Sequence, residues 1–383
     1  MRERGKTPRG PSPLVLTFAL SVVLLVAVSG WLLTDPATTR ADALRTGGLA
    51  AGAVVALYAL WLNDRRRQVE EGRQRVERER HELELLRAER DRERVTDERF
   101  ARSVELLGHD ADQVRVGALH ALAALARDRA DYSQTVLDVL CSYLRRPFEN
   151  PNLGKEHNLG DESGLGVERD LSNERDLGAE RELQVRLTAQ RLIVDLLPPA
   201  GSEQASFDLD LTGASLEYFD LSGRKIGELS LRRATLLSRT NFNRCEITGP
   251  AWFTDATFGQ GRLRGHFHCQ GATFHDRAWF HRTEFGFPVY FTDTAFRGES
   301  NFRKAIFADE AILRDASFGS SLDLDRARFA GYADLRMSGR PHPVSLYNTL
   351  VDPGLVPDLV KLPPFWTLSP LPDGSARITD PRS

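Results

Sequence analysis

The spacing of apolar and polar positions changes several times along this chain, and its first regular pattern is a long apolar run. Residues 14–33 form twenty consecutive positions without an ionisable side chain. At a rise of about 1.5 Å per residue, a helix of this length crosses a hydrocarbon core of about 30 Å. A secretory signal peptide has a shorter apolar region and a small-residue cleavage site, so we predict an uncleaved membrane span.

A second apolar stretch, residues 46–62, is predicted to be another membrane-spanning helix, which makes residues 1–62 a helical hairpin. Gly48 and Gly52 lie four residues apart within it, a spacing that lets two helices approach closely in a membrane. The same spacing arises often by chance. A packing role for these two glycines is therefore one of two interpretations.

Basic residues on the flanks of the two stretches predict the orientation of the hairpin. Four basic residues precede residue 14, and Arg65, Arg66 and Arg67 follow residue 62. The connection between the stretches carries two arginines, which are offset by two aspartates. By the positive-inside rule, we predict a multi-pass protein of the plasma membrane with both termini in the cytoplasm.

Residues 63–99 form a highly charged segment with twelve acidic residues and twelve arginines, many of them opposed four residues apart. Such pairs add about 0.2–0.5 kcal/mol each to a helix, so we predict a charged stalk helix. Val69, Val76 and Leu83 lie seven residues apart, which is typical of a coiled-coil seam. The companion positions of this seam are mostly polar. The pattern favours a solvated single helix, and a homo-oligomer formed through the stalk helix is the alternative.

The next part of the chain is predicted to contain further helices and one linker. Residues 100–147 carry apolar residues at spacings of three and four, which predicts a helical unit that resembles a HEAT-like hairpin stack. Residues 148–181 are rich in glycine, asparagine and charge without apolar periodicity, which predicts a flexible linker. Residues 182–197 predict another helix, which ends at Pro198.

From residue 205 to residue 335 large apolar side chains recur every five residues, and later in mostly alternating steps of five and six. Of eighteen such positions from residue 242 onward, twelve are phenylalanine, and fifteen have a small residue two positions upstream. These positions are Phe242, Ile247, Phe253, Phe258, Leu263, Cys269, Phe274, Phe280, Phe285, Phe291, Phe296, Phe302, Phe307, Leu313, Phe318, Leu324, Phe329 and Leu335.

This part of the chain resembles the pentapeptide-repeat family, whose unit is A-(D/N)-L-x-x with a central leucine or phenylalanine. Local matches are LTGASLEYFDLSG at 211–223 and GATFHDRAWF at 271–280. The resemblance implies a right-handed quadrilateral β-helix with four repeats per coil. The six-residue steps depart from the strict unit and predict solenoid coils of about 22 residues. The order of the segments also looks like that of membrane-anchored pentapeptide-repeat proteins of actinobacteria.

A five-residue spacing matches neither the 3.6-residue period of a helix nor the two-residue period of a strand. It suits a solenoid that turns a corner at each unit and points two side chains per face inward. About six coils at a strand spacing of about 4.8 Å would make a rod of about 30 Å. The residues predicted to fill its axis as the structural core are Phe253, Phe258, Phe274, Phe280, Phe285, Phe291, Phe296, Phe302, Phe307, Phe318 and Phe329.

The stretch HFHCQGATFHDRAWFH at 266–281 holds four histidines and one cysteine, which raises the question of a metal site. In the repeat register, Phe267 and Cys269 point inward with their usual volumes exchanged, so the core stays filled. His268, His275 and His281 then point outward. Zinc needs ligands that converge at about 2.0–2.3 Å, so we favour surface scaffold and predict no metal and no cofactor.

The three cysteines are too few and too scattered for a disulfide framework. Cys245 occupies an inward position one coil before Cys269 and is expected on the same face, as a buried and reduced pair. Residues 336–383 hold nine of the nineteen prolines and are predicted to be a Pro-rich tail or cap. Within this tail, Pro372, Asp373 and Gly374 predict a small hairpin.

The sequence favours a binding role over catalysis. No glycine-rich phosphate loop, G-x-S-x-G elbow or H-E-x-x-H motif is present in it, so we expect no enzymatic activity. We predict a cytosol-facing, non-catalytic interaction scaffold with an unknown protein partner. A membrane sensor or signalling adaptor, in which the stalk relays assembly, is the alternative.

A third function comes from the resemblance, because part of the family mimics DNA towards type II topoisomerases. That activity requires a strongly negative rod. Residues 201–340 carry 18 acidic and 18 basic residues, and the whole chain has a formal net charge of −3. The neutral rod disfavours DNA mimicry, and we expect no nucleic acid among the partners.

Overall fold

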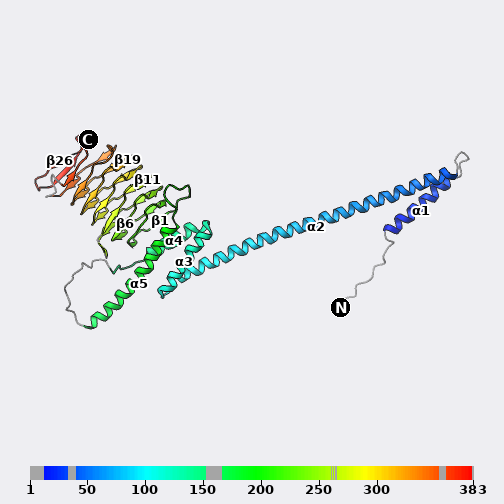
Figure 1. Cartoon of the computed structure of the whole chain (residues 1–383), viewed down its shortest axis with the longest axis horizontal. Helices are drawn as coiled ribbons and strands as arrows, with labels where there is room; N and C mark the ends of the chain where they lie inside the picture. The colour runs from blue at the N-terminus through cyan, green and yellow to red at the C-terminus, as the bar shows by residue number, and fades with distance from the viewer. Residues whose placement is uncertain are drawn as a thin grey trace. The chain divides into compact units, whose positions relative to one another are not determined.

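The computed structural model describes residues 13–32, 40–151, 166–259, 261, 263, 265–352 and 359–381. The chain divides into two compact units, Met1–Val95 and Thr96–Ser383. The first contains helix α1 and most of helix α2, and the second contains the remaining helices and every strand of the described residues (Figure 1).

The first unit contains two apolar helical segments, in α1 (Pro13–Leu32) and at the start of α2 (Arg40–Leu106). Among the described residues, one helical segment, Arg45–Arg66, is long and apolar enough to cross a membrane by length and composition. The apolar part of α1, Val15–Trp31, is shorter. The predicted pair of membrane-spanning helices is therefore supported for one span only.

Gly47, one residue before the predicted pair of glycines, makes the close helix contact in this unit. A Cβ atom on Gly47 would clash with Ser29 Oγ and lie 3.1 Å from the main-chain oxygen of Leu25. A Cβ atom on Gly48 or Gly52 would meet open space, so these two glycines do not make the contact between α1 and α2, and their packing role stays a prediction. The small residue is needed where the two backbones meet, and the spacing of the glycines did not reveal that position.

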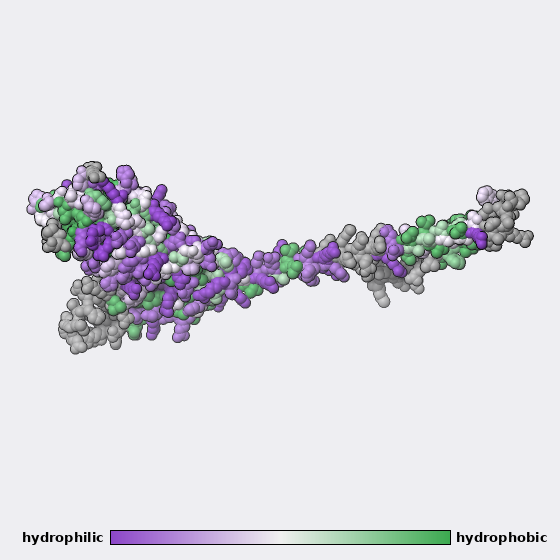
Figure 2. Space-filling view, turned by 45° about the horizontal axis from the view of Figure 1, so that its top comes forward, coloured by the Kyte–Doolittle hydropathy of each residue, from purple (hydrophilic) through white to green (hydrophobic). Residues whose placement is uncertain are grey.

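The predicted stalk is part of one continuous helix, because α2 runs on to Leu106. Hydrophilic side chains cover most of the visible face of this part of α2 (Figure 2). Leu83, Leu85 and Leu86 are exceptions and are 50–57% exposed. The side chains of Val69 and Val76 lie outside the described residues, so the coiled-coil seam stays a prediction.

Three helices and one short 3-10 turn follow α2 in the second unit. They are α3 (Asp112–Asp128), the turn Ala130–Tyr132, α4 (Ser133–Leu144) and α5 (Gly166–Leu196). The flexible linker predicted at 148–181 is wrong from Gly166 onward, and the rest of it beyond residue 151 lies outside the described residues. Arginine, glutamate and leucine all favour helix, so a charged segment without apolar periodicity extends a helix that is packed at its other end.

The strands form four sheets that run along the solenoid, numbered here in the order in which the chain visits them. Sheet 1 contains β1 (Leu209–Asp210), β4 (Leu229–Ser230), β8 (Ala251–Trp252), β12 (Ala278–Trp279), β16 (Ser300–Asn301), β20 (Leu322–Asp323) and β23 (Val344–Ser345). Sheet 2 contains β2 (Ser215–Glu217), β5 (Thr235–Leu237), β9 (Thr257–Gly259), β13 (Glu284–Phe285), β17 (Ile306–Phe307), β21 (Arg328–Phe329), β24 (Leu350–Val351), β27 (Ala376–Thr379) and β26 (Thr367–Pro370).

Sheets 3 and 4 are shorter than the first two. Sheet 3 contains β6 (Arg239–Asn241), β10 (His266–His268), β14 (Val289–Tyr290), β18 (Ala311–Ile312), β22 (Ala333–Asp334) and β25 (Val360–Lys361). Sheet 4 contains β3 (Lys225–Ile226), β7 (Glu246–Ile247), β11 (Thr273–Phe274), β15 (Ala295–Phe296) and β19 (Ser317–Phe318). The four parallel faces make a β-solenoid of about six turns, as predicted.

The strand register confirms the predicted coil length and reveals two longer coils, of which the second runs from Ala333 to its partner Val360. Phe285 pairs with Phe307, and Phe307 pairs with Phe329, so these two consecutive coils have the predicted length. Phe258 pairs with Phe285, so the coil between them is longer by five residues. Leu263 lies in this longer coil and is 61% exposed. Its predicted place in the core series is therefore wrong, because five extra residues imitate one repeat.

The two kinds of step correspond to two kinds of corner. Five-residue steps turn through one left-handed residue, as at Arg282, Asp293 and Lys304, whose φ angles are 56–58°. These corners join sheet 1 to sheet 2 and sheet 3 to sheet 4. The extra residue of each six-residue step lies at the other two corners. A left-handed residue other than glycine is uncommon, so the regular series of them shows how strongly the stacked coils determine the backbone.

Helices cover the first coil of the solenoid (Figure 1). The side chain of Gln134 on α4 accepts a hydrogen bond from the amide of Asp208 and donates one to its carbonyl oxygen, both at 2.9 Å. The chain that follows α5 forms a bridge between Pro199 and Arg224. One hydrophobic core runs from the helices into the solenoid. These contacts occupy the strand edge that the first coil would otherwise expose.

The C-terminal residues extend the solenoid and then cover it, so the predicted boundary at residue 335 is wrong. Strands β23, β24 and β25 pair in parallel with the preceding coil. The predicted hairpin is confirmed, since β26 pairs with β27 in antiparallel fashion on either side of Pro372, Asp373 and Gly374. Strand β27 also pairs with β24 and closes the exposed edge of sheet 2.

We expect Phe280→Ala to lower the free energy of unfolding by about 3–5 kcal/mol, because it removes a fully buried ring from the axis. Phe318→Ala is the matched control, because β19 is the last strand of sheet 4 and leaves this ring partly buried. We expect the control to cost about 1–2 kcal/mol. Urea denaturation of the full chain in detergent measures both changes, and equal losses would contradict the axial role of Phe280.

Candidate functional site

The phenylalanines predicted for the structural core form a continuous aromatic column. Ten of the eleven are 0–1% exposed, and Phe318 is only partly buried. The ring of Phe280 stacks on Phe253 at 4.3 Å and on Phe302 at 4.7 Å between centroids. Because the column takes up the inward positions, any binding chemistry of the solenoid lies on its outward side chains.

The histidine-rich stretch fits this rule. Phe267 is fully buried between Phe242 and Phe291, with ring centroids 5.4 and 5.6 Å away, and Cys269 is fully buried beside it. His268 stacks on Tyr290 at 5.2 Å, on the outer surface of sheet 3. In the part of the chain that the structure describes, no group of three or more histidine, cysteine, aspartate or glutamate side chains is placed to hold a metal ion.

The two solenoid cysteines flank one corner and do not share a face, which corrects the expected arrangement. Cys245 leads into β7 of sheet 4, whereas Cys269 follows β10 of sheet 3. Both are free and buried, as is Cys141 on α4. Burial raises the pKa of Cys245 to about 12 and holds the pKa of Cys269 well above its ordinary value.

A polar groove of about 790 Å³ lies over sheet 3 and the corner that joins it to sheet 4. Its lining includes Arg239, Asn241, Arg244, His268 and Gln270, and we call it the corner groove. The strand register aligns Asn241 with His268, although a coil with five extra residues separates them in the sequence. The insertion before β10 concealed this alignment in the sequence.

Hydrogen-bond donors and positive charge dominate the corner groove. Arg239 and Arg244 are exposed, and Asp293 is the one carboxylate among the described lining residues. Burial, and next the positive charge of Arg239, lower the pKa of His268, so this imidazole is neutral at pH 7. The amide oxygen of Gln270 is buried without a hydrogen-bond partner among the described residues. The groove therefore suits a polar ligand that carries negative charge.

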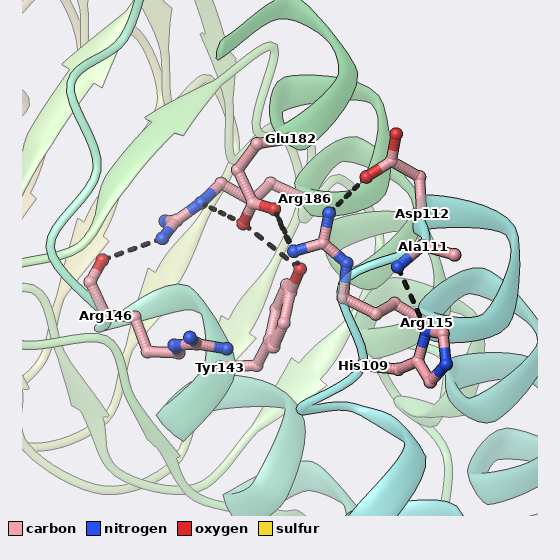
Figure 3. Close-up of polar contacts among 8 residues, drawn as sticks. All are labelled: His109, Ala111, Asp112, Arg115, Tyr143, Arg146, Glu182 and Arg186. Carbon is pink, nitrogen blue, oxygen red and sulfur yellow. Dashed lines mark hydrogen bonds and ion pairs between the residues drawn. The ribbon is translucent and has the colours of Figure 1, made fainter. Parts of the chain in front are cut away.

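A second polar cluster holds the helices of the second unit together (Figure 3). The carboxylate of Glu182 on α5 lies 2.7 Å from Nη1 of Arg115 on α3 and 3.0 Å from Nε of Arg186 on α5. Tyr143 on α4 donates a hydrogen bond to the same carboxylate at 3.1 Å. One carboxylate thus joins three helices. Sequence reasoning missed this role because Glu182 lies next to the boundary of the predicted linker.

Arg186 also completes the C-terminal end of α4. Its guanidinium donates hydrogen bonds to the carbonyl oxygens of Leu144 and Arg146 at 2.9 and 2.7 Å. Carbonyl groups at the end of a helix have no partner within it, so hydrogen bonds from a cation satisfy them. The positive charge also interacts favourably with the negative end of the helix dipole. Burial lowers the pKa of Arg186, and burial beside Glu182 raises that of Tyr143 to about 12. This cluster is structural and exposes little surface to a ligand.

Comparison with known proteins identifies the repeats. A family model described as pentapeptide repeats (9 copies) matches residues 270–317, which lie wholly within the solenoid. No curated protein and no solved structure matches the chain. The match supports the predicted pentapeptide repeats and the solenoid that they form.

We expect none of the three thiols to react with Ellman's reagent at pH 8 while the chain is folded. An ordinary thiol, with a pKa near 8.5, is partly ionised at that pH, whereas burial keeps these thiols protonated. All three should react after unfolding in guanidinium chloride. Rapid labelling of the folded chain, followed by mass spectrometry of the labelled peptide, would contradict this expectation.

We expect Glu182→Gln to lower the free energy of unfolding by about 2–4 kcal/mol, because Arg186, at 2% side-chain exposure, loses its ionic partner. Glu105→Gln is the control, since its ion pair with Arg102 is largely exposed, at 69% and 65%. We expect the control to cost less than about 0.5 kcal/mol. Urea denaturation distinguishes the two, and equal effects would show that Glu182 does not hold the helices together.

Proposed function

We propose that this pentapeptide-repeat solenoid protein is a membrane-anchored, non-catalytic scaffold that offers its solenoid to protein partners in the cytosol. The observation that carries the proposal is the division of roles within each coil. Inward side chains build one aromatic column, and outward side chains stand in a fixed register along four sheets. Such a surface is rigid before a partner arrives, so binding loses little conformational entropy.

The charged side chains of the solenoid also support a binding role. Carboxylates on its surface form ion pairs with arginines one coil away, as between Asp255 and Arg282 at 2.5 Å and between Asp352 and Arg328 at 2.5 Å. Paired carboxylates of this kind stabilise neighbouring coils. They are solvated groups held by solenoid geometry, and this fits a scaffold better than general acid–base catalysis.

Membrane anchoring is the second part of the proposal. We assign both apolar helices, α1 and the Arg45–Arg66 segment of α2, to the membrane as a hairpin with cytoplasmic termini. The apolar composition of the second segment and the arginines that follow it support this assignment. We also propose the plasma membrane as the location, in line with the membrane-anchored actinobacterial proteins that the chain resembles.

A membrane sensor or adaptor is the second candidate, and the exposed leucines of the stalk favour it. Leu83 and Leu86 lie three residues apart, so they share one face of α2, and each is at least 50% exposed. A second copy anchored in the same bilayer would cover them. Crosslinking of the full chain in membranes would show dimers if this candidate is correct.

We expect the full chain to stay in the membrane pellet after alkaline carbonate extraction, because its apolar helices lie in the bilayer. A variant without residues 13–66 should move to the supernatant. In inverted vesicles, trypsin should cleave the arginine-rich stalk, whereas in right-side-out vesicles the stalk should be protected. Extraction of the full chain by carbonate would contradict anchoring, and the opposite protease pattern would contradict the orientation.

The scaffold role requires capture of proteins through the solenoid. Affinity capture from native membranes should recover partners with the tagged full chain and lose them with a chain that lacks residues 205–361. Equal recovery by both chains would contradict the proposed function.

A further inference from the structure

A recess of about 440 Å³ lies between α5 and the first coil of the solenoid. Leu187, Gln190 and Val194 contribute one face of α5 to it, since they are spaced by three and four residues. Tyr218 and Ser222 contribute from the first coil. We call this cavity the α5 recess. Its volume falls in the range of ordinary ligand pockets.

One feature of the α5 recess is unexplained by folding alone. Gln190 is only 5% exposed, and its amide oxygen has no hydrogen-bond partner among the described residues. A buried amide oxygen without a partner destabilises the fold, and a hydrogen-bond donor of a bound ligand would satisfy it. Tyr218 occupies a left-handed corner of the solenoid, as Ser238 does one coil later, and it is 37% exposed beside the recess.

The α5 recess continues into the corner groove. Ser222 lines both cavities, and Asp220 of the recess accepts a hydrogen bond at 3.0 Å from Asn241 of the groove. The corner groove also contains Arg239 and Arg244, and neither has an ion-pair partner within the described ranges. One continuous surface thus combines apolar walls, amide groups and two free cations.

We propose that the α5 recess and the corner groove together bind an extended acidic peptide segment of a partner protein. This inference rests on the proposed scaffold function and names the face of the solenoid that performs it. An apolar side chain of the peptide lies against Leu187, Val194 and Tyr218. The side chain of Gln190 bonds the peptide backbone. Carboxylates of the peptide bind Arg239 and Arg244, in the two-pronged geometry that guanidinium groups favour.

The distribution of charge determines which part of the peptide lies in the recess and which part lies in the corner groove. Three carboxylates of the recess lining, Asp195, Glu217 and Asp220, outnumber its two arginines, Arg191 and Arg224. In the corner groove two arginines face one carboxylate, so an acidic side chain is favoured there over the recess. The acidic residues of the peptide must therefore follow the apolar one and lie in the corner groove. A bare phosphate chain would place negative charge at both ends and leave Gln190 unpaired. The observations consequently favour a peptide over a nucleic acid.

The test uses the full chain in a neutral detergent and a fluorescein-labelled peptide that has one leucine followed by four glutamates spaced by glycine and serine. Fluorescence anisotropy should show saturable binding. The double variant Arg239→Glu/Arg244→Glu should weaken it at least tenfold, and Arg239→Gln/Arg244→Gln by an intermediate factor. The matched control is Arg303→Glu/Lys304→Glu, an exposed basic pair at another corner, which should change the affinity less than twofold.

Three results would overturn the inference: absence of binding by the parent chain, equal weakening by the two charge-reversal variants, or tighter binding of a labelled oligothymidylate of eight nucleotides. Replacing the four glutamates by glutamines should abolish binding, and retained affinity would count equally against it. Capture from native membranes separates this failure from failure of the scaffold role. If the Arg239→Glu/Arg244→Glu chain still recovers partners through residues 205–361, the docking site is wrong and the scaffold stands.

Discussion

Stacking of aromatic rings along one axis is the constraint on which the solenoid depends. Successive coils lie about one strand spacing apart, so each inward ring contacts the ring above and the ring below. Phe285, for example, lies 4.9 Å from Phe258 and 5.0 Å from Phe307. Exchange of volumes at Phe267 and Cys269 shows that the axis requires filled space at each level and tolerates either side chain as its source. Continuity of this column fixes the register of all four sheets.

The fixed register determines which outward side chains lie next to one another on the surface. Residues one coil apart in the sequence become neighbours, and a change on one face leaves the column undisturbed. The same constraint explains why residues such as Arg282 and Lys304 occupy left-handed corners, where glycine would be less strained. The corner conformation is imposed by the coils, and the side chain there is free to serve the surface.

The sequence predicted those features that repeat and missed those that occur once. Spacing of five and six residues was enough for the length of a regular coil, and the turn residues after Pro370 were enough for the hairpin. Leu263 was wrongly placed in the core series because an insertion of five residues has the length of one repeat. The last coil was not predicted because its many prolines and glycines interrupt the five-residue spacing, although its strands still pair in parallel. The α5 recess depends on side chains of a helix and of the first coil, which lie far apart in the sequence, and no local pattern marks such a meeting.

Helix α5 links the structural cluster to the proposed docking site. In its second half, Glu182 and Arg186 fix it to α3 and α4. Over the next two turns, Leu187, Gln190 and Val194 form the wall of the recess. A segment seated in the recess therefore contacts the helical unit and the first coil at once. Because the two already share one hydrophobic core, such binding would add contacts across a preformed junction and would require little rearrangement of either part.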